Sequence, residues 1–156
     1  MLFRSRAELA VPVWAKLSAN TDRVVEIAGA AASSGAAAVT LINTMLGMQI
    51  SLGSAGPVLG NGGGGLSGPP IHAIAVRAVH DVAVALPHVD IIGVGGISDG
   101  SGAVEMMMVG AKAVQVGTAT FARPDACARV LAGAARIVRS GGGTSWGSVH
   151  RRALGE

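Results

Sequence analysis

The stretch VDIIGVGGISDG, residues 89–100, holds one complete transition from a strand to a helix. Residues 89–95 are mainly apolar and β-branched, which predicts a fully buried strand. The glycine pair after it leads into residues 100–110, which have helical character. A strand buried on both faces is typical of a parallel sheet covered by helices.

Three further apolar runs resemble this strand, at residues 11–17, 37–43 and 113–117. Further helical segments lie at residues 22–34, 71–86 and 124–140. The order predicts an α/β fold of four βα units, with parallel strands and outer helices. Such a chain is either an open doubly wound sheet or half of an eight-stranded barrel. Its 156 residues suffice for only half of a barrel of about 250.

The composition indicates a globular protein, since 50% of the residues are hydrophobic and 13% are charged. The twelve Lys and Arg residues are scattered, so nucleic-acid binding is not expected. The single cysteine, Cys127, has no partner for a disulfide or a zinc site, and no apolar run approaches the ~20 residues that cross a bilayer. We therefore expect a cytoplasmic protein without a metal or a membrane span, with Cys127 as a small buried side chain.

The connection over residues 44–68 is unlike the others, because nine of its residues are glycine, including the run 62–65. A loop of this length inside a compact domain is usually functional. The alternative is a disordered low-complexity insert. Composition leaves both interpretations open.

Polar or glycine residues stand where each predicted strand ends. In chain order they are Lys16, Asn43, Gly95-Gly96 and Gly117-Thr118. Glycine turns after successive barrel strands commonly cradle a phosphate, and a lysine buried at a strand end needs an anionic or electron-rich partner. Together these ends predict a cofactor site. A snorkelling lysine, a turn-forming asparagine and tight glycine turns are the alternative interpretations.

Several other residues are expected to be structural. The methionines at 106–108 should pack in the core, and the histidines at 72, 80, 88 and 150 should lie at the surface or at helix ends. Glu26 and Glu105 fall within helices and should be solvated. Residues 20–22 offer an N-cap for the helix after them, and Gly35 and Gly110 stand where C-terminal glycines belong.

Five motifs, in their order and spacing, resemble the second half of dihydroorotate dehydrogenase. They are PVWAKLSAN (12–20), LINTMLGM (41–48), GGLSGP (64–69), GVGGI (93–97) and AVQVGT (113–118). The second and third resemble the class 1 enzymes, particularly the kind that works with an iron–sulfur flavoprotein partner. The resemblance implies the C-terminal half of a TIM (β/α)8 barrel, with strands 5 to 8 of the barrel in residues 1–156 and no second domain.

The same resemblance implies an FMN-containing enzyme that oxidises dihydroorotate to orotate in pyrimidine biosynthesis. Lys16 would match the lysine that contacts the isoalloxazine ring, and Asn43 and Thr44 would bind the pyrimidine substrate. The remaining flavin contacts would come from Ile42, Ser67, Gly68, Gly95, Gly96, Gly117 and Thr118, the last four at the phosphate.

Three departures from the family's pattern matter. The family's general base, a cysteine in class 1 and a serine in class 2, lies in the first half of the barrel. We therefore expect no catalytic residue in this chain, which would be inactive alone. Residues 1–10 look like the tail of a helix that precedes strand five, so the chain is expected to start inside the fold. The run of glycines at 62–65 is also richer than the family usually shows.

Two alternatives to this function remain from the sequence. One is an FMN subunit of the dihydropyrimidine dehydrogenase type, and the other is a non-catalytic half-barrel that binds phosphate. The expected partners are dihydroorotate or orotate, an iron–sulfur FAD electron-transfer subunit, and either further copies of this chain or a complementing N-terminal half.

Overall fold

A computed structural model describes residues 11–156, so the expected helix tail at residues 1–10 lies outside the described part. The main sheet has four strands in the order β1-β2-β7-β8. They are β1 (Trp14–Leu17), β2 (Ala38–Leu41), β7 (Ile91–Val94) and β8 (Ala113–Gln115). Every neighbouring pair is parallel, as the four apolar runs predicted.

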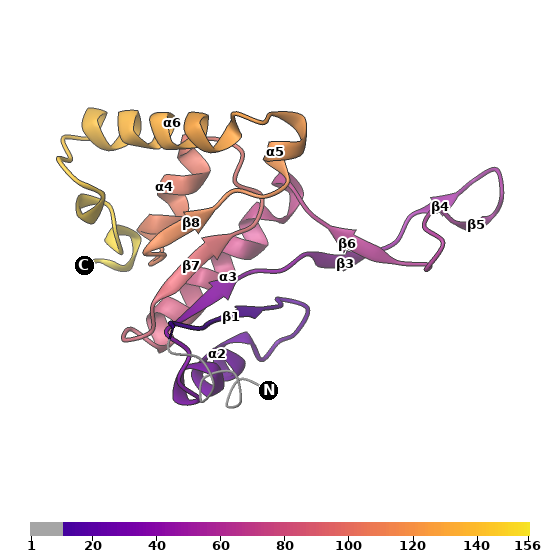
Figure 1. Ribbon diagram of the computed structural model, residues 1–156, viewed down its shortest axis with the longest axis horizontal. Coiled ribbons are helices and arrows are strands. Elements are labelled where there is room, and N and C mark those ends of the chain that lie inside the picture. Colours follow the sequence, from indigo (N-terminus) through magenta and orange to yellow (C-terminus); the bar gives the residue numbers. More distant parts are fainter. Residues whose placement is uncertain (1–10) are drawn as a thin grey trace.

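A helix follows each of these strands, and Figure 1 shows how the helices are arranged around the sheet. They are α2 (Val24–Ser33), α3 (His72–Ala85), α4 (Gly100–Met108) and α6 (Ala126–Ser140). The short helix α5 (Ala119–Ala122), between β8 and α6, was not expected from the sequence. Three 3-10 turns complete the chain: η1 (Pro69–Ile71), η2 (Trp146–Ser148) and η3 (Arg152–Leu154). This is an α/β architecture with a parallel sheet, consistent with part of a (β/α)8 barrel.

The core lies between the sheet and its helices, and it is built from aliphatic side chains. Val39 and Leu41 of β2 and Ile91 of β7 are almost completely buried. A methyl group at Gly93 would lie 3.1 Å from the sulfur of Met106, so β7 and α4 pack closely. Met106 and Met107 are buried, which confirms the packing role expected for the methionines.

The opposite face of the sheet is exposed mainly at its two edges. Side chains alternate between the faces of a strand, so Trp14 and Lys16 of β1 lie on the face away from the core. Trp14 is 54% exposed, whereas Thr40 in β2 and Ile92 in β7 are buried. Within residues 11–156 no strand pairs with the outer edge of β1 or of β8.

Helix ends follow the sequence signals in part. Gly35 and Gly110 come just after α2 and α4 and have positive φ, as expected for C-terminal glycines. The start of α2 differs, because its N-cap position is Arg23 and no side chain caps it. Thr21 accepts a hydrogen bond from the Arg23 amide at 3.1 Å, and Asn20 is engaged elsewhere.

The glycine-rich connection forms an ordered arm, so the interpretation as a disordered insert is wrong. Strand β3 (Met45–Gly47) pairs with β6 (Gly64–Leu66), and β4 (Ile50–Ser51) pairs with β5 (Gly56–Pro57), both antiparallel. Figure 1 shows the two ribbons leaving the body as one long projection. Leu46 is 78% exposed and Leu52 98% exposed, so the arm carries apolar side chains into solvent.

Candidate functional site

A cavity of about 360 Å³ opens where the parallel strands end. Its wall includes all ten residues that the sequence analysis assigned to a flavin or a substrate. They are Lys16, Ile42, Asn43, Thr44, Ser67, Gly68, Gly95, Gly96, Gly117 and Thr118. The carboxyl ends of parallel strands meet at one edge of a sheet, which is why residues so far apart in the chain share one cavity.

The turn after β7 approaches its neighbours closely. Gly95 and Gly96 have φ of 138° and 67°, which side chains other than glycine rarely adopt. A methyl group at Gly96 would lie 2.8 Å from the carbonyl oxygen of Gly68, and one at Gly95 would lie 2.7 Å from Cβ of Ala75. Glycine therefore lets the turn sit directly between the root of the arm and α3.

The turn after β8 is open where the β7 turn is packed. A methyl group at Gly117 would meet no atom within 4 Å. The carbonyl oxygen of Gly117 accepts hydrogen bonds from the amide and the hydroxyl of Thr120, which fixes the start of α5. Within the described residues, the amides of Gly96 and Thr118 donate to no backbone carbonyl, so both donors are available to a ligand.

Lys16 and Asn43 supply the polar side chains at the ends of β1 and β2. The amide of Asn43 donates to the carbonyl oxygen of Leu17 at 2.9 Å, so the two strand ends are tied together. Lys16 is exposed, whereas a lysine buried at the end of its strand was expected. It is exposed because β1 is an outer strand of the described sheet and its face away from the core is open.

Asn20 fixes the root of the arm. Its side-chain nitrogen donates to the carbonyl oxygen of Thr44 at 2.9 Å, and its side-chain oxygen accepts from the amide of Leu46 at 2.8 Å. Residues 20–22 were expected to offer the N-cap of α2, but Asn20 binds the arm instead. Its partners lie 24 and 26 positions away, so no local pattern could have revealed this bridge.

His72 is the first residue of α3 and Glu105 is exposed within α4, as expected for a helix-end histidine and a solvated glutamate, but the contact between them was not predicted. One imidazole nitrogen, Nδ1, lies 2.8 Å from the carbonyl oxygen of Gly95, and the other, Nε2, lies 3.2 Å from the Glu105 carboxylate. The His72 side chain is only 19% exposed. The carbonyl oxygen can only accept, so Nδ1 is the donor. Through this hydrogen bond, His72 fixes the β7 turn to the start of α3.

Two arginines also line the cavity, and the sequence analysis did not single them out. Arg123 follows α5 and Arg129 lies on α6. Nε of Arg123 is 3.3 Å from a carboxylate oxygen of Asp125. One sequence signal could have indicated that these arginines line the cavity: they follow shortly after the glycine turn at the end of β8. They add positive charge beside the backbone donors of Gly96 and Thr118.

Asp99 caps α4 at the edge of this site. Its Oδ1 accepts from the Ser101 hydroxyl at 2.6 Å and from the Gly102 amide at 3.0 Å. These hydrogen bonds, that of Ser101 first, lower the pKa of the Asp99 carboxyl below its usual value. The carboxylate therefore remains ionised at neutral pH and holds the first turn of α4.

Cys127 is exposed on α6, so the expectation of a buried thiol is wrong. The buried residues of α6 recur at Ala126, Val130 and Ala134, and Cys127 lies one position off that stripe. Across residues 11–156, no three His, Cys, Asp or Glu side chains gather as a metal site would require. No helix in that range is both long and apolar enough to cross a bilayer.

The arrangement suits a ligand with a phosphate and a polar ring system. The wall includes both backbone donors and two guanidinium groups, which are the partners that a dianion requires. A lysine ammonium and an asparagine amide stand at the neighbouring strand ends, where they can bind polar groups on a planar ring. The wall between them is mainly apolar, as is usual for cofactor sites.

Comparison with known proteins identifies a matching family model and similar sequences. A family model described as dihydroorotate dehydrogenase matches residues 2–138. The catalytic subunit of dihydroorotate dehydrogenase B (NAD(+)) from Bacillus thuringiensis (strain Al Hakam) is 48% identical over 121 residues, which cover 78% of this chain and 39% of that protein. The same subunit from Cutibacterium acnes (strain DSM 16379 / KPA171202) is 46% identical over 127 residues, 81% of this chain and 41% of that protein. The chain thus spans about two fifths of these relatives' length.

Proposed function

Because the chain belongs to the dihydroorotate dehydrogenase family, we propose that it is the C-terminal, FMN-binding half of a barrel that oxidises dihydroorotate to orotate. The observation that carries the proposal is the shared cavity: ten residues assigned from five separate motifs line one wall. The relatives are catalytic subunits, which supports an electron-transfer subunit as the eventual partner.

The wall fits the phosphate of FMN. The amides of Gly96 and Thr118 are available as donors, and backbone donors without side chains are the usual ligands of a flavin phosphate in barrels. At Gly117 the wall is open, so a phosphate can approach the backbone there. Ser67, Gly68 and Ile42 would contact the rest of the flavin.

When bound, FMN would accept the hydride that leaves dihydroorotate. In our proposal Lys16 places an ammonium beside the flavin ring, where a preorganised positive charge stabilises developing negative charge. Asn43 and Thr44 hold the pyrimidine through its amide groups, so the ring is oriented before the reaction. The proton would be taken by a general base outside this chain, and the isolated chain would therefore be inactive.

The phosphate contact can be tested with a charge placed in the open part of the wall. In Gly117→Asp, the new carboxylate meets no protein atom but would repel the phosphate, so FMN affinity, measured by quenching of flavin fluorescence, should fall at least about tenfold. Gly60→Asp adds the same charge to the arm, where a substituent also meets nothing within 4 Å, and should leave FMN affinity unchanged. Equal affinities in the two variants would place the flavin elsewhere.

The role of Lys16 can be tested in a complemented barrel. This chain would be combined with the N-terminal part of the Cutibacterium acnes relative, and dihydroorotate oxidation measured with an artificial acceptor. Lys16→Ala should raise the barrier to flavin reduction by about 2 to 4 kcal/mol and lower the flavin's reduction potential. Lys112, the other lysine of the chain, pairs with Asp90, and Lys112→Ala is the matched control.

Turnover at an enzymatic rate by the isolated chain with FMN would show that the proposed division of labour is wrong. So would a complemented barrel in which both lysine variants reduce the flavin as fast as the unchanged chain. FMN binding without turnover, followed by turnover on complementation, is the expected pair of results.

A second function, association through the open sheet, has its own supporting observation. The outer edges of β1 and β8 have no strand partner within residues 11–156. Beside β8 lies an apolar groove of about 350 Å³, whose wall includes Cys127, Leu131 and Trp146. Unpaired edges next to exposed apolar surface favour pairing with another chain.

We therefore propose that the chain pairs with a complementing half or with further copies. A stable monomer in light scattering that binds no hydrophobic dye would contradict this.

A further inference from the structure

A second cavity, of about 610 Å³, adjoins the first and differs from it in its charged lining. We call it the arginine cleft. Its lining comprises Ser98, Asp99, Gly100, Ser101, Arg123, Arg129, Ala132, Gly133, Arg136 and Ile137. Three of these residues, Ser98, Arg123 and Arg129, also line the first cavity, whereas Arg136 lines only the cleft.

The packing of α4 against α6 builds this cleft. Arg129 and Arg136 are seven residues apart, close to two full turns, so they lie on the same side of α6. The two helices meet at glycines: a methyl group at Gly100 would lie 2.7 Å from Cα of Gly133. This contact brings the start of α4, with the hydroxyls of Ser98 and Ser101, beside the arginines.

The positive charge of the cleft is only partly balanced by carboxylates. Arg23, Arg77 and Arg151 each pair with a carboxylate near in sequence, but Arg129 and Arg136 pair with none among residues 11–156. Arg123 contacts Asp125 at 3.3 Å, outside the cleft. The one carboxylate in the lining, Asp99, has its Oδ1 engaged by Ser101 and Gly102.

We propose that the arginine cleft binds a phosphate-bearing anion, at a site separate from that of the flavin phosphate. Guanidinium groups bind phosphate through paired N–H donors, and several converging on one hollow favour an anion with at least two charges. The Ser98 hydroxyl supplies a further donor, whereas the Ser101 hydroxyl already donates to Asp99. Neither the family assignment nor flavin binding is needed for this site.

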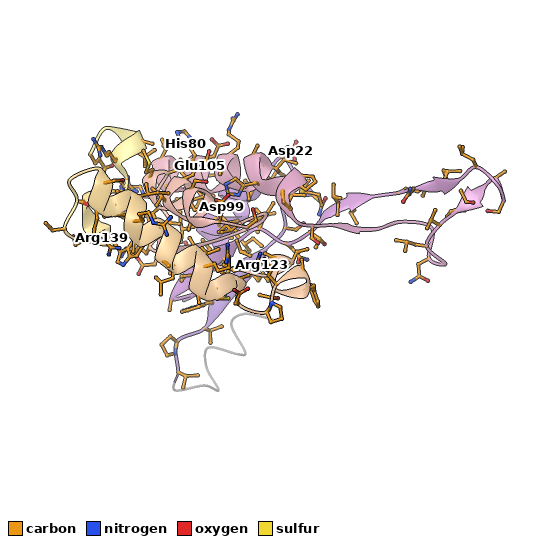
Figure 2. All side chains as sticks on the ribbon, turned by 90° about the horizontal axis from the view of Figure 1, so that it is seen from above. Asp22, His80, Asp99, Glu105, Arg123 and Arg139 are labelled. Atoms are coloured by element: carbon orange, nitrogen blue, oxygen red, sulfur yellow. The ribbon has the colours of Figure 1, made fainter. Side chains whose placement is uncertain are left out.

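Arg139 provides the internal control. It lies on α6, is exposed like Arg136, and carries the same charge, but it is not part of the lining. Figure 2 shows Arg123 close to one end of α6 and Arg139 toward its other end. Replacing either Arg136 or Arg139 changes the net charge equally, so only a localised site distinguishes them.

The test is calorimetric titration of the full 156-residue chain with inorganic pyrophosphate at low ionic strength. Arg136→Ala should weaken binding at least about tenfold, the effect expected when a charge-assisted hydrogen bond is lost. Arg139→Ala should leave it unchanged. Asp99→Asn keeps a side-chain cap for α4 but removes a negative charge from the lining, so it should tighten binding.

Two further arms separate the sources of phosphate and the two cavities. ADP that binds more tightly than pyrophosphate would identify a nucleotide as the ligand, and equal affinities would identify the phosphate groups alone. Because Arg123 and Arg129 border both cavities, saturation with FMN should weaken pyrophosphate binding without abolishing it, and FMN affinity should be the same in Arg136→Ala as in the unchanged chain. The two measurements therefore distinguish an absence of anion binding in the cleft from an absence of FMN binding in the first cavity.

Several results would overturn the proposal. They are no heat of binding, equal weakening by Arg136→Ala and Arg139→Ala, weaker binding in Asp99→Asn, or complete loss of pyrophosphate binding when FMN is added. The last would assign the anion to the first cavity.

Discussion

Two glycine-rich loops follow strands of the same sheet, and the turn after β7 is packed where the outer part of the arm is open. After β7, Gly95 and Gly96 are packed so closely against Ala75, His72 and Gly68 that no side chain fits. After β2, the chain runs out into the arm, where an added methyl group would be crowded at Gly64 and Gly65 of β6 but would meet no atom within 4 Å at Gly60. Glycine content alone would assign the two loops the same role.

The difference lies in what each glycine permits. In the β7 turn, the missing side chain allows three segments to meet at the cavity, so the turn is fixed from several sides. At the outer part of the arm, the missing side chains leave an exposed ribbon that is held only by its own strand pair, β4 with β5. A glycine at a site of close approach is therefore a packing residue, whereas one in an open ribbon contributes little to stability.

Substitution of one glycine from each loop would test this contrast most strongly. Gly96→Ala places a methyl group 2.8 Å from the Gly68 carbonyl oxygen at a φ of 67°, and we expect a loss of about 3 kcal/mol in the free energy of unfolding. Gly60→Ala should change that free energy by less than about 0.5 kcal/mol. Urea unfolding of both variants is the measurement. Similar losses would show that the two loops are equally constrained.

The support behind the β7 turn can be removed without touching its glycines. His72→Ala leaves the carbonyl oxygen of Gly95 without its donor, at a cost of about 1 to 3 kcal/mol. His88 is exposed, and His88→Ala should change the free energy of unfolding little. Thermal unfolding compares the two variants. If they lose the same stability, the hydrogen bond to Gly95 does not hold the turn.

The root of the arm is the next weakest point. Asn20→Ala removes the bonds to Thr44 and Leu46, so we expect a loss of about 1 kcal/mol and faster hydrogen exchange of the Leu46 amide. Asn61, on the exposed outer arm, is the control, since Asn61→Ala should leave this amide protected. Unchanged exchange in Asn20→Ala would show that the strand pair alone fixes the arm.

The smallest effect is a pH dependence at the start of α4. The pKa of Asp99 is lowered in the folded chain, so its contribution is present above its usual pKa of about 3.9 and is lost as pH falls through the lower folded value. The side chain is exposed, so solvent screening keeps this contribution below about 1 kcal/mol. Asp99→Asn should remove this part of the acid sensitivity, measured as the free energy of unfolding from pH 6 to 3. Identical pH profiles would contradict the assignment.

The strands, main helices and cavity wall could be predicted because their signals are local. Each buried strand is a short apolar run, and the end of a parallel strand is fixed by the strand itself. Residues such as Lys16 and Gly117 therefore reach one cavity in any parallel arrangement with these strands. The arm was predicted only as a long loop, because its ribbons depend on pairings between residues as distant as Met45 and Leu66.

The contacts of His72, the exposure of Cys127 and the arginine cleft could not be predicted, because they depend on contacts between residues far apart in the sequence. His72 meets Gly95 and Glu105 across 23 and 33 positions. The exposure of Cys127 depends on which stripe of α6 meets α4, and the arginine cleft depends on the contact between Gly100 and Gly133. These features follow from how helices pack, which the chain's periodicity does not specify.

The arm has no ionisable side chain anywhere between Thr44 and Gly68. Its charge is therefore zero at every pH, and any contact through Leu46 or Leu52 would depend on removing apolar surface from water. That driving force weakens on cooling. Temperature is consequently the variable to which contacts of the arm respond, and a complex held by it would loosen in the cold.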